Sequence, residues 1–209
     1  MEIFQIKDLN FKNRIKYPDM QLKNETTFLC GESGSGKSTL LKLLNGVLSP
    51  HSGSITYQGT AIDTMDPIKL RREVLLVGQT VYLFDKSIRE NFHEYYAYRD
   101  LPPPSDGEIN RYLDICALSM PLDSMCNLLS GGERQRVFLG LNLSLQPKVL
   151  MLDEPTSALD EKTADALMEN ICAHCKERGI TLLVVSHDRA IAEKYADRVI
   201  NLEGGGVRE

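Results

Sequence analysis

The feature that most constrains this chain is a glycine-rich segment, residues 31–39, between an apolar run and a leucine-rich stretch. It reads GESGSGKST and fits the pattern G-x-x-x-x-G-K-[ST] of a phosphate-binding loop. Glycines let the backbone turn with its N–H groups inward, and the following helix adds its positive end. Lys37 then supplies a charge to the β- and γ-phosphates, and Ser38 binds Mg²⁺. An ordinary turn is the alternative, which the flanking strand and helix disfavour.

Around this phosphate loop, short apolar runs alternate with helical patterns along most of the chain. Continuous Val, Ile and Leu strands between helices are typical of a mostly parallel sheet covered on both faces. The sequence therefore predicts an α/β fold. We expect strands at residues 26–30, 54–57, 74–77, 149–152, 180–185 and 198–202, and helices at 39–48, 133–145, 163–178 and 189–195.

The pattern changes between about residues 80 and 130. Ser87 is suited to cap a short helix, residues 102–104 are three prolines that force an extended loop, and residues 108–118 are amphipathic. We interpret this stretch as a small helical subdomain inserted in a single domain that spans residues 1–209. Residues 1–79 and 131–209 then form the nucleotide-binding core.

A second chemical signal lies at residues 149–154, where an apolar strand ends in Asp153 and Glu154. Open α/β sheets bind their ligands at the carboxyl ends of strands. Asp153 is placed to hold Mg²⁺, and Glu154 to activate an attacking water as general base. Taken alone, such an acidic pair is more often the start of a helix or a solvated loop. Together with the phosphate loop, it indicates catalysis.

A third signal is the sequence LSGGE at residues 129–133, which opens another helix with a hydroxyl and two glycines. A helix start of this kind presents free N–H groups to an anion. Ser130 and Glu133 also fit a capping box, which is the simpler interpretation. The two can hold together, because capping does not account for the adjacent glycines.

These motifs in this order resemble an ATP-binding cassette (ABC) domain over essentially the whole chain. By resemblance, residues 31–39 are the Walker A loop, residues 129–133 the signature and Asp153–Glu154 the end of Walker B. The resemblance implies a P-loop NTPase (RecA-like) fold, with a small antiparallel β region and a helical subdomain beside the parallel sheet. The implied nucleotide-binding residues are Gly31, Glu32, Ser33, Gly34, Ser35, Gly36, Lys37, Ser38, Thr39, Ser130, Gly131, Gly132 and Glu133.

The resemblance also implies the remaining parts of the site. The cassette binds ATP and Mg²⁺, and ATP closes a head-to-tail homodimer between the Walker A loop of one copy and the signature of the other. Gln79 is the Q-loop glutamine that senses Mg²⁺ and water, and His187 is the switch histidine that holds Glu154. The implied catalytic residues are Glu154, His187, Gln79 and Lys37; the metal ligands are Ser38, Gln79 and Asp153; the D-loop is Ser157, Ala158, Leu159 and Asp160.

One position departs from the family. An aromatic residue that stacks on adenine is usual two positions after Phe11, and this chain has Asn13 there. Asparagine forms hydrogen bonds but cannot stack. Tyr17 is the nearest aromatic residue that could swing in instead, so the contact with the base is the open part of the predicted site.

The composition of the chain restricts the classes of partner that it can bind. The formal net charge of −5 and the absence of a Lys/Arg run argue against nucleic-acid binding and a polybasic anchor. No apolar run approaches the ~20 residues that a membrane helix needs. By resemblance, we expect a cytoplasmic chain, peripheral on the inner face of the membrane, with a separate membrane-spanning permease subunit. By resemblance, Tyr82, Leu83 and Phe84 line the groove for that subunit; a local mini-core is an equal alternative.

The predicted function is thus the ATP-hydrolysing subunit of an ABC transporter. ABC ATPases also drive non-transport work, such as cell-envelope signalling or DNA- and ribosome-associated tasks. The DNA- and ribosome-associated tasks are disfavoured, because only about fifty residues separate Gln79 from Ser130 and leave no room for a coiled-coil insertion. The compact length and residues 79–91 loosely resemble iron-export cassettes, although neither cargo nor direction is encoded in such a subunit.

The odd set of five cysteines indicates reduced thiols, with Cys172 and Cys175 better explained by packing than by metal binding.

Overall fold

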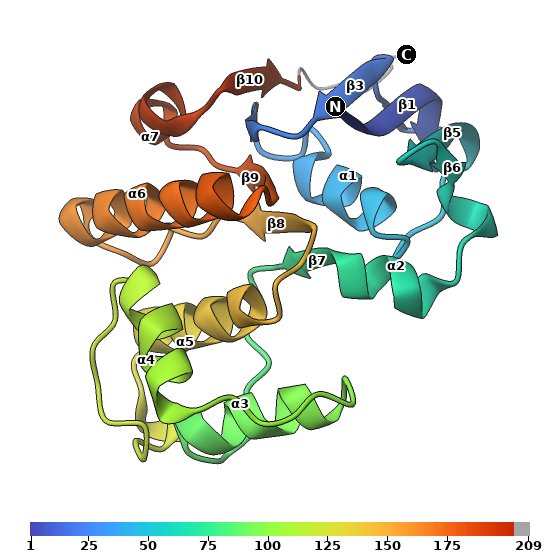
Figure 1. Ribbon diagram of the computed structural model, residues 1–209. Helices are drawn as coiled ribbons and strands as arrows, with labels where there is room; N and C mark the ends of the chain where they lie inside the picture. The colour runs from blue at the N-terminus through green and yellow to red at the C-terminus, as the bar shows by residue number, and fades with distance from the viewer. Residues whose placement is uncertain (203–209) are drawn as a thin grey trace. The chain divides into compact units, whose positions relative to one another are not determined.

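The computed structural model describes residues 1–202, which form two compact units (Figure 1). Among the described residues, unit 1 contains residues 1–76, 147–154 and 175–202. Unit 2 contains residues 77–146 and 155–174. Unit 2 begins near the expected boundary at residue 80 but includes more of the chain than the expected 80–130, because two later helices pack with it.

The central sheet is the one that the apolar runs predict. Its strands follow the order β10-β4-β9-β8-β7, and the pairs β10–β4, β4–β9 and β8–β9 are all parallel. The expected P-loop NTPase architecture is therefore confirmed. The strands are β4 (Thr26–Cys30), β7 (Val74–Val77), β8 (Val149–Asp153), β9 (Thr181–Val185) and β10 (Arg198–Asn201).

A second, antiparallel sheet accompanies it, as the resemblance implied. A short 3-10 helix, η1 (Ile62–Thr64), and the helix α2 (Pro67–Glu73) follow this sheet. Helix α2 was not expected, although Asp66 caps it and Pro67 stands in its first turn. The strands are β1 (Glu2–Phe11), β2 (Ile15–Lys16), β3 (Met20–Lys23), β5 (Ser52–Tyr57) and β6 (Thr60–Ala61).

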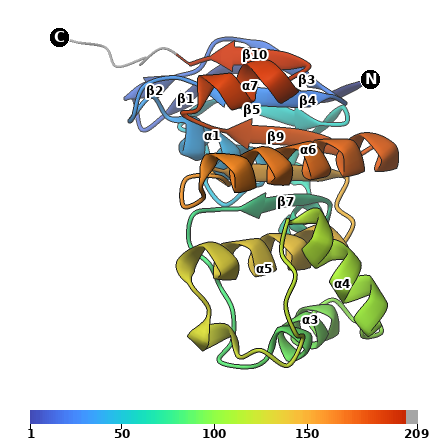
Figure 2. The ribbon, with the colours of Figure 1, turned by 90° about the vertical axis from the view of Figure 1, so that its left-hand side faces the viewer.

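The core of unit 1 lies around helix α1 (Lys37–Leu44), which directly follows the phosphate loop. Four leucines of α1 pack with inward residues of β1, β5, β8 and β9. Side chains on the opposite face of the parallel sheet, such as Phe28 and Leu182, are also fully buried. Helix α7 (Arg189–Tyr195) contacts β4 (Figure 2). Burial on both faces explains why the strands read as continuous apolar runs.

Unit 2 is helical, and three of its helices begin in the same way. Ser87, Ser105 and Ser130 each form a capping box with the glutamate three residues later. Its apolar core includes Phe92 and Val137. The helices are α3 (Ile88–Ala97), α4 (Asp106–Ile115), α5 (Gly131–Ser144) and α6 (Glu161–Arg178, which unit 2 includes as far as residue 174), with a 3-10 turn η2 (Cys126–Leu128) before α5.

Candidate functional site

The phosphate loop connects β4 to α1, and neighbouring segments press closely on its backbone. At Gly31 φ is +146°, and a Cβ there would lie 2.2 Å from the carbonyl oxygen of Leu202. At Gly36 φ is +94°, and a Cβ would lie 2.8 Å from the hydroxyl of Tyr17. Only glycine fits such positions. The glycines of the motif are thus required by close backbone approach as well as by the turn.

The side chain of Lys37 contacts the backbone of this loop. Its side chain is buried, and Nζ donates hydrogen bonds to the carbonyl oxygens of Gly31 at 2.9 Å and Glu32 at 2.8 Å. The first turn of α1 has no acidic residue and no side-chain cap, so its backbone N–H groups face the loop without an internal anion. The buried hydroxyl of Ser35 has no hydrogen-bond partner. These features are those of a cradle for phosphate.

The metal ligands expected in unit 1 meet beside the cradle. The hydroxyl of Ser38, on the first turn of α1, donates to Oδ1 of Asp153 at 2.9 Å. Asp153 is the last residue of β8 and is buried. Hydroxyl and carboxylate oxygens are the ligands that Mg²⁺ prefers, so this pair fits that ion.

Glu154 is held in an unusual backbone conformation at the end of β8. Its φ is +57°, in the left-handed region, and its N–H donates to the carbonyl of Val185 at 3.0 Å. Nε2 of His187 lies 2.9 Å from Oε1 of Glu154, whose side chain is only 13% exposed. Burial raises the pKa of Glu154 above its ordinary value; His187 opposes this shift and the carboxylate of Asp153 adds to it.

The segment after β9 presents His187 to this carboxylate. Ser186 is buried, and its hydroxyl accepts a hydrogen bond from the N–H of Asp188 at 3.0 Å. Asp188 in turn caps α7 by accepting from the N–H of Ile191. The imidazole side chain remains 53% exposed. A cavity of about 830 Å³ is lined by His187 together with Gly31 and Glu32, so the loop and the histidine border one space.

The hairpin between β1 and β2 holds the position expected to face the base. Asn13 is exposed with φ of +53°, and Phe11 packs against the core with Nζ of Lys12 5.3 Å from its ring centroid. Tyr17, the aromatic residue that could swing in to stack on adenine, serves another contact in this structure. Its ring is buried, and its hydroxyl donates to the carbonyl of Gly36 at 2.9 Å, so it supports the loop.

The remaining motif residues belong to unit 2. Gln79 is exposed two residues after β7. Ser130 caps α5, and Oε2 of Glu133 accepts from the backbone N–H of Ser130 at 2.8 Å and from its hydroxyl at 2.7 Å. These bonds lower the pKa of Glu133. The predicted capping box is therefore confirmed, and anion binding at this helix start stays a prediction.

The predicted D-loop lies against the predicted signature. A Cβ on Gly132 would lie 3.3 Å from Leu159 and 3.4 Å from the carbonyl oxygen of Ala158. Asp160 accepts from the backbone N–H of Thr163 at 3.0 Å and from its hydroxyl at 2.6 Å, at the start of α6. Unit 2 thus brings residues 130–133 and 157–160 together, and unit 1 brings together residues 31–38, 153–154 and 187.

The three residues expected to face a membrane subunit differ in exposure. Tyr82 is 67% exposed and Phe84 38% exposed, whereas Leu83 packs against the core of unit 2. Phe84 stacks on Tyr98, with ring centroids 6.2 Å apart, and also contacts Tyr95 edge to face. We call Tyr82, Phe84 and Tyr98 the aromatic surface. Leu83 therefore belongs to a local core, whereas Tyr82 and Phe84 face solvent, and the docking of a membrane subunit here stays a prediction.

The cysteine pair shows no sign of a metal site. Cys175 is buried and Cys172 half-buried on α6, and no disulfide joins the five cysteines, all of which lie within residues 1–202. Within that range, no group of three His, Cys, Asp or Glu side chains is placed to hold a metal ion.

Some contacts that shape this region join distant segments and have no local sequence signal. The support that Tyr17 gives the loop joins residues 19 positions apart, and the close approach of Leu202 to Gly31 joins the segments that follow β10 and β4. The left-handed backbone of Glu154 likewise follows from its bond to Val185 on the neighbouring strand. A pattern within one segment does not reveal such contacts.

Comparison with known proteins agrees with this geometry. Residues 19–157 match the ABC transporter family. The probable iron export ATP-binding protein FetA of Escherichia coli (strain K12) is 38% identical over 183 residues, which cover 86% of this chain and 79% of FetA. The structure of cbiO1 from Clostridium perfringens, described as part of the ABC transporter complex cbiONQ, has a TM-score of 0.84 at 30% identity, covering 98% of this chain and 86% of cbiO1.

A further solved structure is the dimeric bacterial ABC transporter cassette MJ0796, with a TM-score of 0.85 at 25% identity, covering 99% of this chain and 97% of that one. The same cassette is known as a dimer in a post-hydrolysis state bound to ADP and Pi. In residues 1–202 of the present chain, no helix combines the length and the apolarity needed to cross a membrane. The chain belongs to the ABC transporter family, as one of its ATP-binding, ATP-hydrolysing subunits.

Proposed function

We propose that the residues gathered in unit 1 bind the phosphates of ATP and hydrolyse the terminal one. The observation that carries this proposal is the convergence of Lys37, Ser38, Asp153, Glu154 and His187 at the carboxyl ends of β4, β8 and β9. Residues 31–39 bind the phosphates through backbone N–H groups. Lys37 exchanges its two carbonyl partners for β- and γ-phosphate oxygens when ATP enters.

Ser38 and Asp153 are the residues of unit 1 that would hold Mg²⁺, and Gln79 is proposed as a third ligand. When bound, the ion neutralises charge on the phosphates during transfer. The 2.9 Å contact between the hydroxyl and the carboxylate supports the assignment, because it places two oxygens of the kind that Mg²⁺ prefers next to each other. Gln79 is supported by its exposed position after β7.

Glu154 acts as the general base. Its carboxylate takes a proton from the water that attacks the γ-phosphorus, while the bond from that phosphorus to the β,γ-bridging oxygen breaks and ADP leaves with the electron pair. A base works best when its pKa lies near the working pH, and burial moves the pKa of Glu154 in that direction. His187 orients the carboxylate through their 2.9 Å contact and reaches toward the γ-phosphate.

The signature residues of unit 2 form the second half of each site, contributed by the other copy of a head-to-tail homodimer. Ser130, Gly131 and Gly132 begin α5 with backbone N–H groups suited to the γ-phosphate. The D-loop, which lies against Gly132, then faces the same junction. The similarity to the dimeric cassette MJ0796 supports this arrangement.

The work done with ATP is transport through a separate membrane-spanning subunit, with this chain peripheral on the cytoplasmic face of the membrane. Family membership supports this, as does the similarity to cbiO1, part of the transporter complex cbiONQ. The aromatic surface is the proposed docking place, because exposed aromatic side chains beside a helix are suited to receive an apolar partner helix. FetA favours metal export as the first cargo to test.

Replacing Glu154 by Gln should reduce the ATPase rate by about 10²- to 10⁴-fold, because the base is lost while the phosphate cradle stays intact. ATP should then hold the protein as a dimer, which light scattering after size exclusion would detect. Glu169→Gln, an exposed glutamate on α6, is the matched control and should keep full activity. A Glu154→Gln protein with normal turnover would remove Glu154 from this role.

The stability of the same variant should depend on pH in a defined direction. Because the pKa of Glu154 is higher in the folded chain than in the unfolded one, its ionisation costs stability at neutral pH. This cost disappears as the pH falls below about 4.3, the pKa of a glutamate side chain in the unfolded chain. Glu154→Gln should therefore melt above the wild type at neutral pH, with a gap that closes on acidification. A gap that widens on acidification would contradict the raised pKa.

The transport assignment is tested by identifying the partner. Tagged Glu154→Gln protein, expressed in its native cell and purified with ATP from gently solubilised membranes, should retain a multi-span membrane protein identified by mass spectrometry. Replacing Tyr82 and Phe84 by Ser should release that partner without changing ATP binding, since both side chains are exposed. Recovery only of soluble, ribosomal or DNA-bound partners would preserve the ATPase assignment and overturn transport.

A further inference from the structure

The backbone of unit 2 links the aromatic surface to a second segment, residues 121–128, which we call the strap. The N–H of Cys126 donates to the carbonyl of Lys86 at 2.9 Å, and an isolated β-bridge pairs Ser87 with Met125. At the start of α3, the N–H groups of Ile88 and Arg89 donate to carbonyls of the strap at 3.0 Å each. Residues 86–89 are thus paired with residues 122–126 of the strap.

The buried side chain of Asn91 stabilises this pairing by hydrogen bonds. Its side chain is completely buried, and its Oδ1 accepts from the N–H of Phe84 at 2.8 Å. Its Nδ2 faces the carbonyls of Phe84, Lys86 and Ser87 at 3.0 to 3.3 Å and the sulfur of Cys126 at 3.4 Å. A buried amide with so many partners specifies one arrangement, because any other leaves polar groups unpaired.

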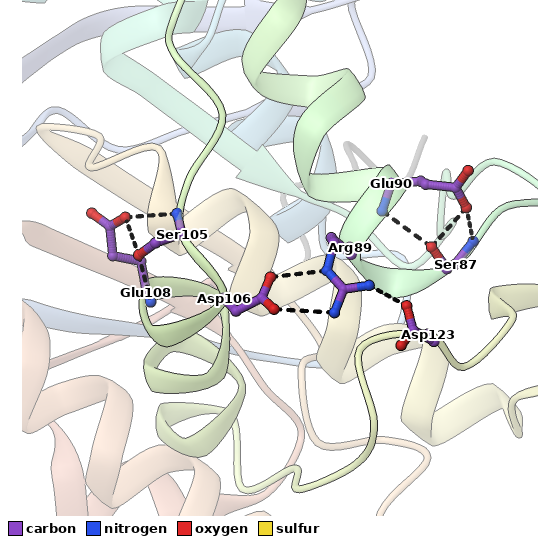
Figure 3. Close-up of polar contacts among 7 residues, drawn as sticks. All are labelled: Ser87, Arg89, Glu90, Ser105, Asp106, Glu108 and Asp123. Atoms are coloured by element: carbon purple, nitrogen blue, oxygen red, sulfur yellow. Dashed lines mark hydrogen bonds and ion pairs between the residues drawn. The ribbon is translucent and has the colours of Figure 1, made fainter.

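Arg89 stabilises the same pairing by ion pairs (Figure 3). Its Nε and Nη2 lie 2.9 and 3.1 Å from the two carboxylate oxygens of Asp106, at the start of α4, and its Nη1 contacts Asp123 in the strap. The forked guanidinium therefore joins α3, α4 and the strap at one point. Exposed ion pairs contribute little to stability, so fixing the relative position of these segments is the larger effect.

The strap leads directly to the signature. Nη1 of Arg134, on the first turns of α5, donates to the carbonyl of Cys126 at 2.6 Å. Two residues beyond the strap, Ser130 caps α5. A continuous set of hydrogen bonds therefore runs from Phe84 through Asn91 and Cys126 to the residues that begin α5.

We propose that Arg89 and Asn91 are positioning residues that make residues 82–91, the strap and the start of α5 respond as one body. This inference rests on the proposed function, in which a membrane subunit docks at the aromatic surface and ATP is bound at the signature. Ordering at the signature is then passed to the aromatic surface, and docking at that surface is passed to the signature with the same coupling free energy. The element that carries the coupling is the strap.

Hydrogen exchange with mass spectrometry tests this in the Glu154→Gln chain, with and without MgATP. MgATP should slow exchange in residues 126–137 because the signature is ordered in the dimer, and should slow residues 82–91 by about threefold or more through the strap. Arg89→Gln should abolish the second effect and leave the first. Arg111→Gln, an exposed arginine on α4 outside this network, is the matched control and should retain both effects.

A purely structural role for Arg89 predicts a different result. Exchange in residues 82–91 would then be faster in Arg89→Gln both with and without MgATP, and the slowing caused by MgATP would persist; that result would overturn the proposal. Asn91→Ala should give the same loss as Arg89→Gln, and the half-buried Arg89 keeps the test usable if the variant at the fully buried Asn91 does not fold. Absence of slowing in residues 126–137 of the parent would instead overturn the shared nucleotide site, and this inference with it.

Discussion

The phosphate loop depends on how closely neighbouring segments approach its backbone. The carbonyl oxygen of Leu202 occupies the space of a Cβ at Gly31, and the hydroxyl of Tyr17 does the same at Gly36. Two segments therefore pack against the loop, one just after β10 and the other just after β2. Lys37 completes this state by satisfying two loop carbonyls. Preorganisation of this kind lowers the ordering cost that phosphate binding would otherwise carry.

The proposed catalytic role of Glu154 depends on a second constraint, at the end of β8. The bond from the Glu154 N–H to Val185 ties the residue to β9, and the left-handed backbone then directs its side chain toward His187. A strained position of this kind persists only where the surroundings determine it, and such positions cluster at functional sites. The two adjacent carboxylates thereby acquire different surroundings: Asp153 meets the Ser38 hydroxyl, and Glu154 meets an imidazole.

Much of this arrangement could be predicted from sequence because it is encoded locally. The apolar runs identified the parallel strands to within two residues, and the residue pattern at positions 31–39 identified the turn between β4 and α1. The capping box at Ser130 was equally visible. What could not be predicted depends on contacts between distant segments. Tyr17 had the right residue type for a base-stacking side chain, yet its bond to Gly36, unseen in the sequence, commits it to the loop.

The central claim is that one active site needs the phosphate loop of one copy and the signature of another. Mixing two inactive variants, Lys37→Ala and Ser130→Arg, tests it most directly, because each lacks a different half of the site. We expect that neither variant hydrolyses ATP alone and that an equal mixture recovers about a quarter of wild-type activity, through heterodimers with one intact site. Substantial ATPase activity in Ser130→Arg alone, or no recovery on mixing two folded variants, would contradict it.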